Sequence, residues 1–435
     1  MNIILRAEKH SKNRVAIGFV AAMLGLTSLA VSSAEEEQAQ TNTLTLQEAI
    51  LSTVTQNPEL LAFGYALRAQ DGRILQAGLS PRPQLNINVE DVLGDGAAQG
   101  LSGAEVTVSI AWVVEGELKQ RRIDVARAGS LALAAEAEIM RLDAAAVTAR
   151  HYIQALAHQL RRDFADQAVA LAEETVVGVE RRVEAGTASS AELSRARAEL
   201  ARRALSREDI NHELNATFHR LAAQWGALTP AFSRVVGNPL VLPEIESFDT
   251  LRAKIEQTPD LNRFLSEQRV AEAVLRLEQA RSKEPWRFSA GVRRLQGSSD
   301  SGFTAGVTIP LDRGNRNQGR IAESRARIEQ SVAEETAARI RIQTNLLVLY
   351  LEMEHSIHRV QTLSEQVVPR VEQALEETRR AYELGSYSYL EWLQVQEELL
   401  EARNELVQAS VEAHQRMIEI ERITGMRIAQ QTPSL

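Results

Sequence analysis

VEAGTASSAELSRARAEL at residues 183–200 and YELGSYSYLEWLQVQEEL at residues 382–399 are two versions of one segment. Aligned without a gap, they place Gly186 on Gly385, and glutamates coincide on the C-terminal side of both glycines. A match this long at one fixed offset indicates an internal repeat. The predicted organisation is a signal peptide at 1–34, a first repeat at 35–228, a proline-containing linker at 229–243, a second repeat at 244–428 and a tail at 429–435.

Each copy contains two short segments in which apolar and polar residues alternate, and this alternation predicts one β-hairpin per copy. In the first copy, Val106, Val108 and Ile110 share one face. Trp112 and Trp286 stand at strand ends, where interfacial tryptophans are found, although packing at a bend would explain them equally well. The predicted strands lie at about 84–92 and 105–112 in the first copy, and at about 287–293 and 303–309 in the second.

A long helical pattern follows each hairpin. It runs from about Leu118 to Ala185 in the first copy, roughly 100 Å at ~1.5 Å per residue, and from about Gly319 to Leu384 in the second. Pro369 interrupts the second pattern, so we expect a kink or a restart there. The glycine after each pattern predicts a sharp tip from which a return helix starts.

A shorter helix is predicted before each hairpin. In the first copy, Thr45 and Glu48 have the spacing of a capping box, and the helical pattern then runs to Gly78. Within it, NPEL at 57–60 matches TPDL at 258–261 of the second copy. Each copy is therefore read as a helix, two strands, a long helix and a return helix.

The N-terminal segment predicts export. Basic residues precede an apolar run at 15–31, and small residues stand before a cleavage position after Ala34. An uncleaved membrane anchor is the alternative interpretation. Removal of the segment would change the formal net charge from −9 to −12, because it holds four Lys or Arg residues and one acid.

Composition excludes several classes of protein. The 435 residues include no cysteine, which excludes disulfide scaffolds, thiolate metal sites and cysteine nucleophiles. The acidic balance argues against nucleic-acid binding, which needs a basic face. Aromatic residues make up only 4% of the chain, so a core of small and aliphatic side chains in close-packed helices is expected.

The predicted strands have one face suited to lipid and one suited to water. Four strands cannot close a β-barrel by themselves, because closure needs about eight strands, whereas three copies of the chain would supply twelve. A soluble sheet packed on helices is the alternative. A membrane protein fits the export signal better.

Four features of the sequence are shared with a known family: the order of elements, the early NPEL, the pattern VxPxxxxALxxxxxAYxxG at 367–385 and the final RITG. By these features the chain resembles the TolC family of outer-membrane efflux proteins over essentially the whole mature chain. Two stretches, 74–92 and 309–326, resemble its CzcC-like, heavy-metal branch, although both depart from that branch's pattern near the strand-to-helix junctions. The resemblance implies a mainly α fold: a TolC-like duplicated helix–β-hairpin–long helix unit. It also implies a homotrimer with an α-helical tunnel and a shared twelve-stranded barrel.

The resemblance also implies partners and sites. The tunnel would join a periplasmic adaptor and an inner-membrane RND-type pump to the outside of a Gram-negative cell, and outer-membrane lipid would surround the barrel. Acidic residues after each tip glycine would ring a periplasmic aperture, and a tyrosine before it would take part in closed-state hydrogen bonding. The implied aperture residues are Glu391, Gln394, Tyr382, Glu192 and Arg195, so the acidic ring is half present. The implied adaptor-docking tips are Ala185, Gly186, Thr187, Leu384, Gly385 and Ser386.

Other kinds of site have little support in the sequence. His355 and His358 share a helical face and are weak metal-ligand candidates, since surface helices carry such pairs by chance. Glu391 can equally be interpreted as a solvated carboxylate on a helix surface, with no role at an aperture. No catalytic or phosphate-binding motif is present, so we expect neither an enzyme nor a cofactor.

The favoured function is an exit duct for heavy-metal cations. A duct for drug efflux or type I protein secretion is the first alternative. A periplasmic coiled-coil scaffold or adaptor is the second, and it should lack the four strands.

Overall fold

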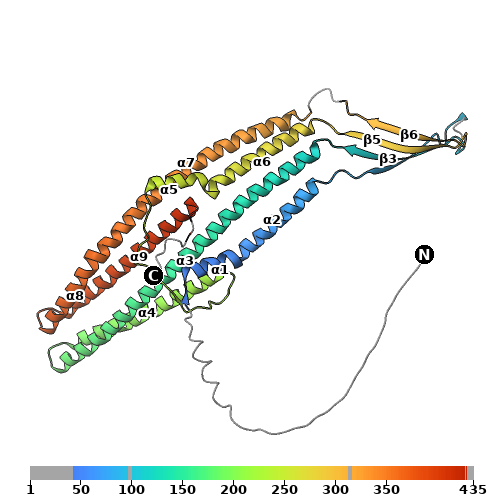
Figure 1. Ribbon diagram of the computed structural model, residues 1–435. Coiled ribbons are helices and arrows are strands. Elements are labelled where there is room, and N and C mark those ends of the chain that lie inside the picture. The colour runs from blue at the N-terminus through green and yellow to red at the C-terminus, as the bar shows by residue number, and fades with distance from the viewer. Residues whose placement is uncertain (1–42, 97–99, 312–315, 427, 429–435) are drawn as a thin grey trace, which may run out of the picture. The chain divides into compact units, whose positions relative to one another are not determined.

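The computed structural model describes residues 43–96, 100–311, 316–426 and 428. The predicted signal peptide at 1–34 and the tail at 429–435 lie outside the described residues. Within residues 43–435, long helices lead into a small sheet at one end and into two helical tips at the other (Figure 1).

Four helices lie side by side and continue into four strands in the same order. The helices α2 (Pro58–Ala77), α3 (Leu118–Glu184), α6 (Pro259–Arg281) and α7 (Gln318–Thr362) contact one another in that sequence. The strands β2 (Gln84–Glu90), β3 (Glu105–Val114), β5 (Trp286–Leu295) and β6 (Ser301–Thr308) follow the same order in one sheet (Figure 1). The hairpins of the two repeats therefore meet at β3 and β5.

The sheet is antiparallel throughout, and its register produces rows of matched side chains. Ile87, Val108, Val292 and Phe303 form one row across all four strands. The next row towards the helices runs from Leu85 through Ile110 to two alanines. Because side chains alternate between the faces, these rows make one face apolar.

The long helix of the first repeat spans 67 residues without a break. It ends beside α4 (Ser190–Ala223), and in the second repeat α8 (Val368–Glu383) ends beside α9 (Tyr389–Thr424). The predicted restart at Pro369 is confirmed: α7 passes into a π-helical turn, Leu363–Val367, and α8 begins just before the proline. The missing N–H of proline explains why regular α-helical bonding fails there.

The prediction of one helix from Thr45 to Gly78 is wrong, although the capping box at Thr45 is present. The chain forms α1 (Leu46–Gln56) and α2, which are separated at Asn57. Pro58 disfavours helical backbone at the residue before it, and Asn57 adopts ψ 125°. The Asn57 Oδ1 atom then caps α2 by accepting from the N–H of Glu59 at 2.9 Å and of Leu60 at 3.0 Å.

The second repeat has the same interruption. There α5 (Phe248–Lys254) and a 3-10 turn (Ile255–Gln257) precede Thr258 and Pro259, where α6 begins. The matching NPEL and TPDL segments thus mark helix breaks. The proline in each segment is the sequence signal for this break.

The linker at 229–243 packs closely on the helices. It contributes β4 (Arg234–Val235), which pairs in parallel with β1 (Thr43–Leu44). The Tyr152 hydroxyl of α3 donates to the carbonyl of Val236 at 2.6 Å, and the Gln159 side chain exchanges two hydrogen bonds with the backbone of Val235. The core around these contacts is rich in alanine from α3, as the low aromatic content predicts.

Candidate functional site

The two helical tips have the same backbone geometry. Gly186 and Gly385 have φ of 72° and 79°, in the left-handed region that favours glycine. The N–H of Thr187 donates to the carbonyl of Arg182, and the N–H of Ser386 donates to the carbonyl of Ala381. The six predicted tip residues are all exposed, and Leu384 presents 83% of its surface to solvent.

The two predicted aperture glutamates are both capping residues. Glu391 accepts from the Ser388 N–H at 2.7 Å and from the Ser388 hydroxyl at 2.8 Å. Glu192 makes the same pair of contacts with Ser189, at 3.5 and 3.4 Å. The hydrogen bonds from Ser388 lower the pKa of Glu391, so its carboxylate keeps its charge in more acidic solution. The S-x-x-E spacing at both positions is the signal that sequence reasoning missed.

The other predicted aperture residues take no part in these capping boxes. Gln394 is exposed and donates to Glu398 at 3.0 Å, while Arg195 is exposed on α4. Tyr382 is buried, with 4% of its surface exposed. The assignment of these residues to an aperture needs further copies of the chain and stays a prediction.

An aromatic cluster joins the tips of the two repeats. Tyr382 stacks on Trp392 with ring centroids 5.0 Å apart and meets Tyr389 edge to face. Arg182 of the first repeat places its guanidinium 4.3 Å from the Tyr382 ring and donates to the Tyr382 carbonyl. Burial raises the pKa of the Tyr382 hydroxyl. Because a cation over an aromatic face is attracted to it, Arg182 links the two hairpins.

Three polar atoms in this cluster are buried without a hydrogen-bond partner among the described residues: Tyr382 Oη, Trp392 Nε1 and Arg182 Nε. The hydrogen bonding that resemblance implied for Tyr382 is therefore not made by its hydroxyl within the described part of one copy. Sequence reasoning overlooked Arg182 and Trp392. Their common signal was proximity to the tip glycines, four positions before Gly186 and seven after Gly385.

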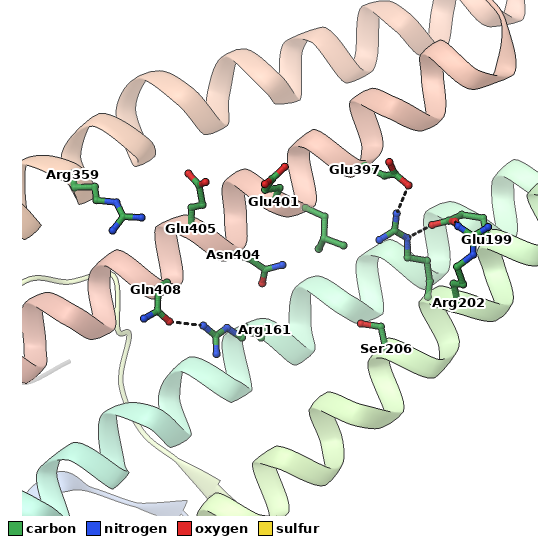
Figure 2. Close-up of a pocket in the computed structure, with 12 residues that line it drawn as sticks. Arg161, Glu199, Arg202, Ser206, Arg359, Glu397, Glu401, Asn404, Glu405 and Gln408 are labelled. Atoms are coloured by element: carbon green, nitrogen blue, oxygen red, sulfur yellow. Dashed lines mark hydrogen bonds and ion pairs between the residues drawn. The ribbon is translucent and has the colours of Figure 1, made fainter.

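A charged groove of about 700 Å³ lies between the two helical hairpins, α3–α4 and α8–α9, on the side of the tips that faces the sheet (Figure 2). Its α4 wall carries the buried carboxylate of Glu199, which forms salt bridges with Arg202 at 2.7 Å and with Arg203 at 2.6 Å. Its α9 wall carries Glu397, 4.0 Å from Arg203 across the groove. Towards the linker, Arg161 of α3 donates to Gln408 at 3.1 Å. These contacts connect the two hairpins across the groove.

The apolar face of the sheet is uncovered. Its exposed side chains show between 37% and 96% of their surfaces; they are Leu85, Ile87, Val89, Val106, Val108, Ile110, Trp112, Val292, Phe303 and Val307. The opposite face is polar, and there Arg293 contacts Glu105 at 2.9 Å and Thr107 at 3.1 Å. A contiguous exposed apolar face of this size marks an interaction surface.

The remaining candidates carry no site. His355 and His358 are exposed on α7. Across the described ranges, no three His, Cys, Asp or Glu side chains are grouped so that they could hold a metal ion. None of the described helices has an apolar stretch long enough to cross a membrane.

The geometry defines the class of protein. A duplicated helical unit that opens into a four-stranded sheet at one end and two hairpin tips at the other is the fold of outer-membrane channels. A solved structure of CusC, described as forming a transmembrane channel, matches with a TM-score of 0.71 and 15% identity over 92% of this chain and 96% of its own.

Comparison with known sequences finds a family domain in the second repeat. Residues 256–426 match the family described as Outer membrane efflux protein. The cobalt-zinc-cadmium resistance protein CzcC of Cupriavidus metallidurans is 28% identical over 88% of this chain and 90% of its own length. The nickel-cobalt-cadmium resistance protein NccC of Alcaligenes xylosoxydans xylosoxydans is 26% identical over 73% and 72%. The chain thus carries a TolC-like outer membrane efflux domain, and these similarities indicate an outer-membrane protein.

Proposed function

We propose that the protein is the exit duct of a tripartite efflux system and passes heavy-metal cations out of the cell. The uncovered apolar face of the sheet carries this proposal. Lipid covers such a face at no cost in hydrogen bonding, because the backbone groups inside the sheet are already paired. The polar face then lines the path of the cargo.

Three copies complete the duct. The strands β2 and β6 have free edges in the described part of one copy, and unpaired edges favour pairing with another chain. The helices below these edges also expose apolar residues, among them Tyr65 on α2 and Ile340 on α7, exposed by 67% and 61%. The two edges are different surfaces, so their contact is head-to-tail, and a rotation of one third of a turn between copies closes it into a ring of three. Three copies supply the twelve strands of a closed barrel.

The partners follow from the position of the tips. The helices carry the tips far from the sheet, so in a membrane-seated trimer the tips reach into the periplasm, where an adaptor docks on them. An RND-type pump in the inner membrane supplies the energy, since the duct itself has no catalytic role. The exposed tips and the charged groove beside them support this arrangement.

Heavy-metal cargo is supported by two observations. The relatives CzcC and NccC are named for resistance to cobalt and cadmium, with zinc or nickel. In a trimer, three copies of Glu391 at the tips concentrate negative charge, which favours cations over anions.

Deletion of the gene tests the cargo. We expect increased sensitivity to zinc, cobalt, cadmium or nickel, with unchanged sensitivity to a panel of drugs, and restoration by the gene on a plasmid. Sensitivity to drugs alone, or a defect in protein secretion, would instead assign the duct to those substrates. Recovery of the protein as a soluble periplasmic monomer would support a scaffold and contradict the duct.

Glu391→Gln tests the aperture. Glutamine can keep the capping box, because its amide oxygen still accepts from Ser388, while the charge is lost. We expect a severalfold lower preference for cations over anions in planar bilayers, with normal trimer assembly. Glu398→Gln, an exposed change two turns further along α9, is the control. Equal ion selectivity in Glu391→Gln and wild type would remove Glu391 from the aperture.

A further inference from the structure

Adjacent arginines on β5 project to opposite faces of the sheet. Arg293, on the polar face, is neutralised by Glu105 at 2.9 Å and Glu90 at 3.5 Å. Arg294, on the apolar face, is exposed, and no hydrogen bond or ion pair reaches it within the described ranges. Arg293 therefore has its counter-charges within the chain, whereas Arg294 has none among the described residues.

Arg294 stands at the outer end of the apolar face. It forms a cross-strand row with Val106 on β3 and Ser301 on β6. The row of Trp112 and Phe288 lies six residues closer to the helices, which corresponds to ~20 Å along the strands. The apolar face is thus bounded by aromatic rings at the helix end and by a guanidinium at the far end.

This spacing places the guanidinium of Arg294 within reach of lipid headgroups. An apolar band in an outer-membrane sheet is about 25 Å tall and is flanked by aromatic girdles. Strands of such barrels tilt by ~35–45°, so ~20 Å along the strands spans ~15 Å of this height. With the aromatic row at the periplasmic boundary, the Arg294 row lies in the outer part of the band, and its long side chain extends to the outer boundary. An arginine at the bilayer midplane is strongly disfavoured, whereas the same residue at the boundary is tolerated.

We propose that Arg294 binds the phosphate of a lipid headgroup in the outer leaflet. This inference rests on the proposed membrane-seated duct. A planar guanidinium matches two phosphate oxygens at once, and the neighbouring Ser301 hydroxyl offers a further donor. The apolar rows below the arginine accept the acyl chains of the same lipid. Charge complementarity therefore selects a phosphate-bearing lipid over a neutral one.

The test uses the full-length trimer in nanodiscs of phosphatidylcholine, with and without lipid A. Native mass spectrometry counts the lipid A retained, and thermal unfolding reports its stabilising effect. We expect lipid A to stabilise the wild type, and Arg294→Gln to bind it about fivefold more weakly, the effect of one cationic side chain near an anionic surface. Arg287→Gln, the same change on the polar face of the same strand, should retain wild-type binding.

The outcomes separate this inference from the proposed function. A chain that does not insert in any nanodisc contradicts the duct itself. A chain that inserts, but retains equal amounts of lipid A in the wild type and Arg294→Gln, contradicts the lipid site alone. Equal stabilisation by inorganic phosphate in phosphatidylcholine discs would assign Arg294 to a free anion and also overturn the lipid site.

Discussion

Ile87→Arg is expected to prevent assembly in the outer membrane. Ile87 is 61% exposed on the apolar face and lies in the row of Val108 and Val292, between the Arg294 row and the aromatic end. A cationic side chain on the lipid face near the bilayer midplane costs about 2–4 kcal/mol, and a trimer would incur this cost three times. The amount of protein in outer-membrane fractions, and of trimer in mild detergent, should fall well over tenfold.

Asn88→Arg is the matched control for this change. Asn88 is the next residue of β2, is also exposed and faces the polar side. Arginine there faces water inside the duct, so assembly should continue. Normal assembly of Ile87→Arg would contradict a lipid-facing sheet, while loss of both variants would point to a general folding defect in β2.

The extent to which the fold could be predicted depended on how local each signal was. Periodicity placed the strands and the 67-residue helix within a few residues, because alternation and helical spacing are properties of neighbouring positions. The restart of the second long helix was anticipated through Pro369 for the same reason, although its π-helical form was not. Pro58 carried an equally local signal, and the break at Asn57 was missed because helical spacing continues on both sides of it.

The candidate site was less predictable, since its contacts join distant segments. Arg182 and Tyr382 lie on different repeats, and periodicity does not report which faces of two hairpins meet. The capping role of Glu391 is local and readable from Ser388, yet the resemblance to a family drew attention to an aperture instead. A capping role and an aperture role are compatible, because the cap fixes the carboxylate at the tip and leaves it charged.

The same limit applies to the linker. Its three prolines suggested a simple connection, whereas Tyr152 and Gln159 of α3 hold its backbone by side-chain hydrogen bonds. Such contacts pair polar groups that the sequence places more than 70 residues apart. They tie the linker and β1 to the middle of α3, where the alanine-rich core lies.

Glu421→Gln is expected to stabilise the protein at neutral pH by about 3 kcal/mol. Glu421 lies near the end of α9 with 6% of its surface exposed, and burial raises its pKa to about 7 from an ordinary value of 4.5. The folded state therefore binds a proton more tightly than the unfolded state, and stability falls as the pH rises from about 4.5 to about 7. One pKa unit corresponds to about 1.4 kcal/mol, and the neutral amide avoids this loss.

The pH dependence distinguishes this effect from improved packing. The gain in the free energy of unfolding from Glu421→Gln should be small below pH 4.5, grow through the range up to pH 7 and then level off. Denaturant unfolding of the detergent-solubilised trimer at several pH values measures it. Glu405→Gln, an exposed change on the same helix, should alter stability little at any pH. A gain from Glu421→Gln that is equal at all pH values would mean that the carboxyl does not titrate in this range and that the gain comes from better packing of the amide.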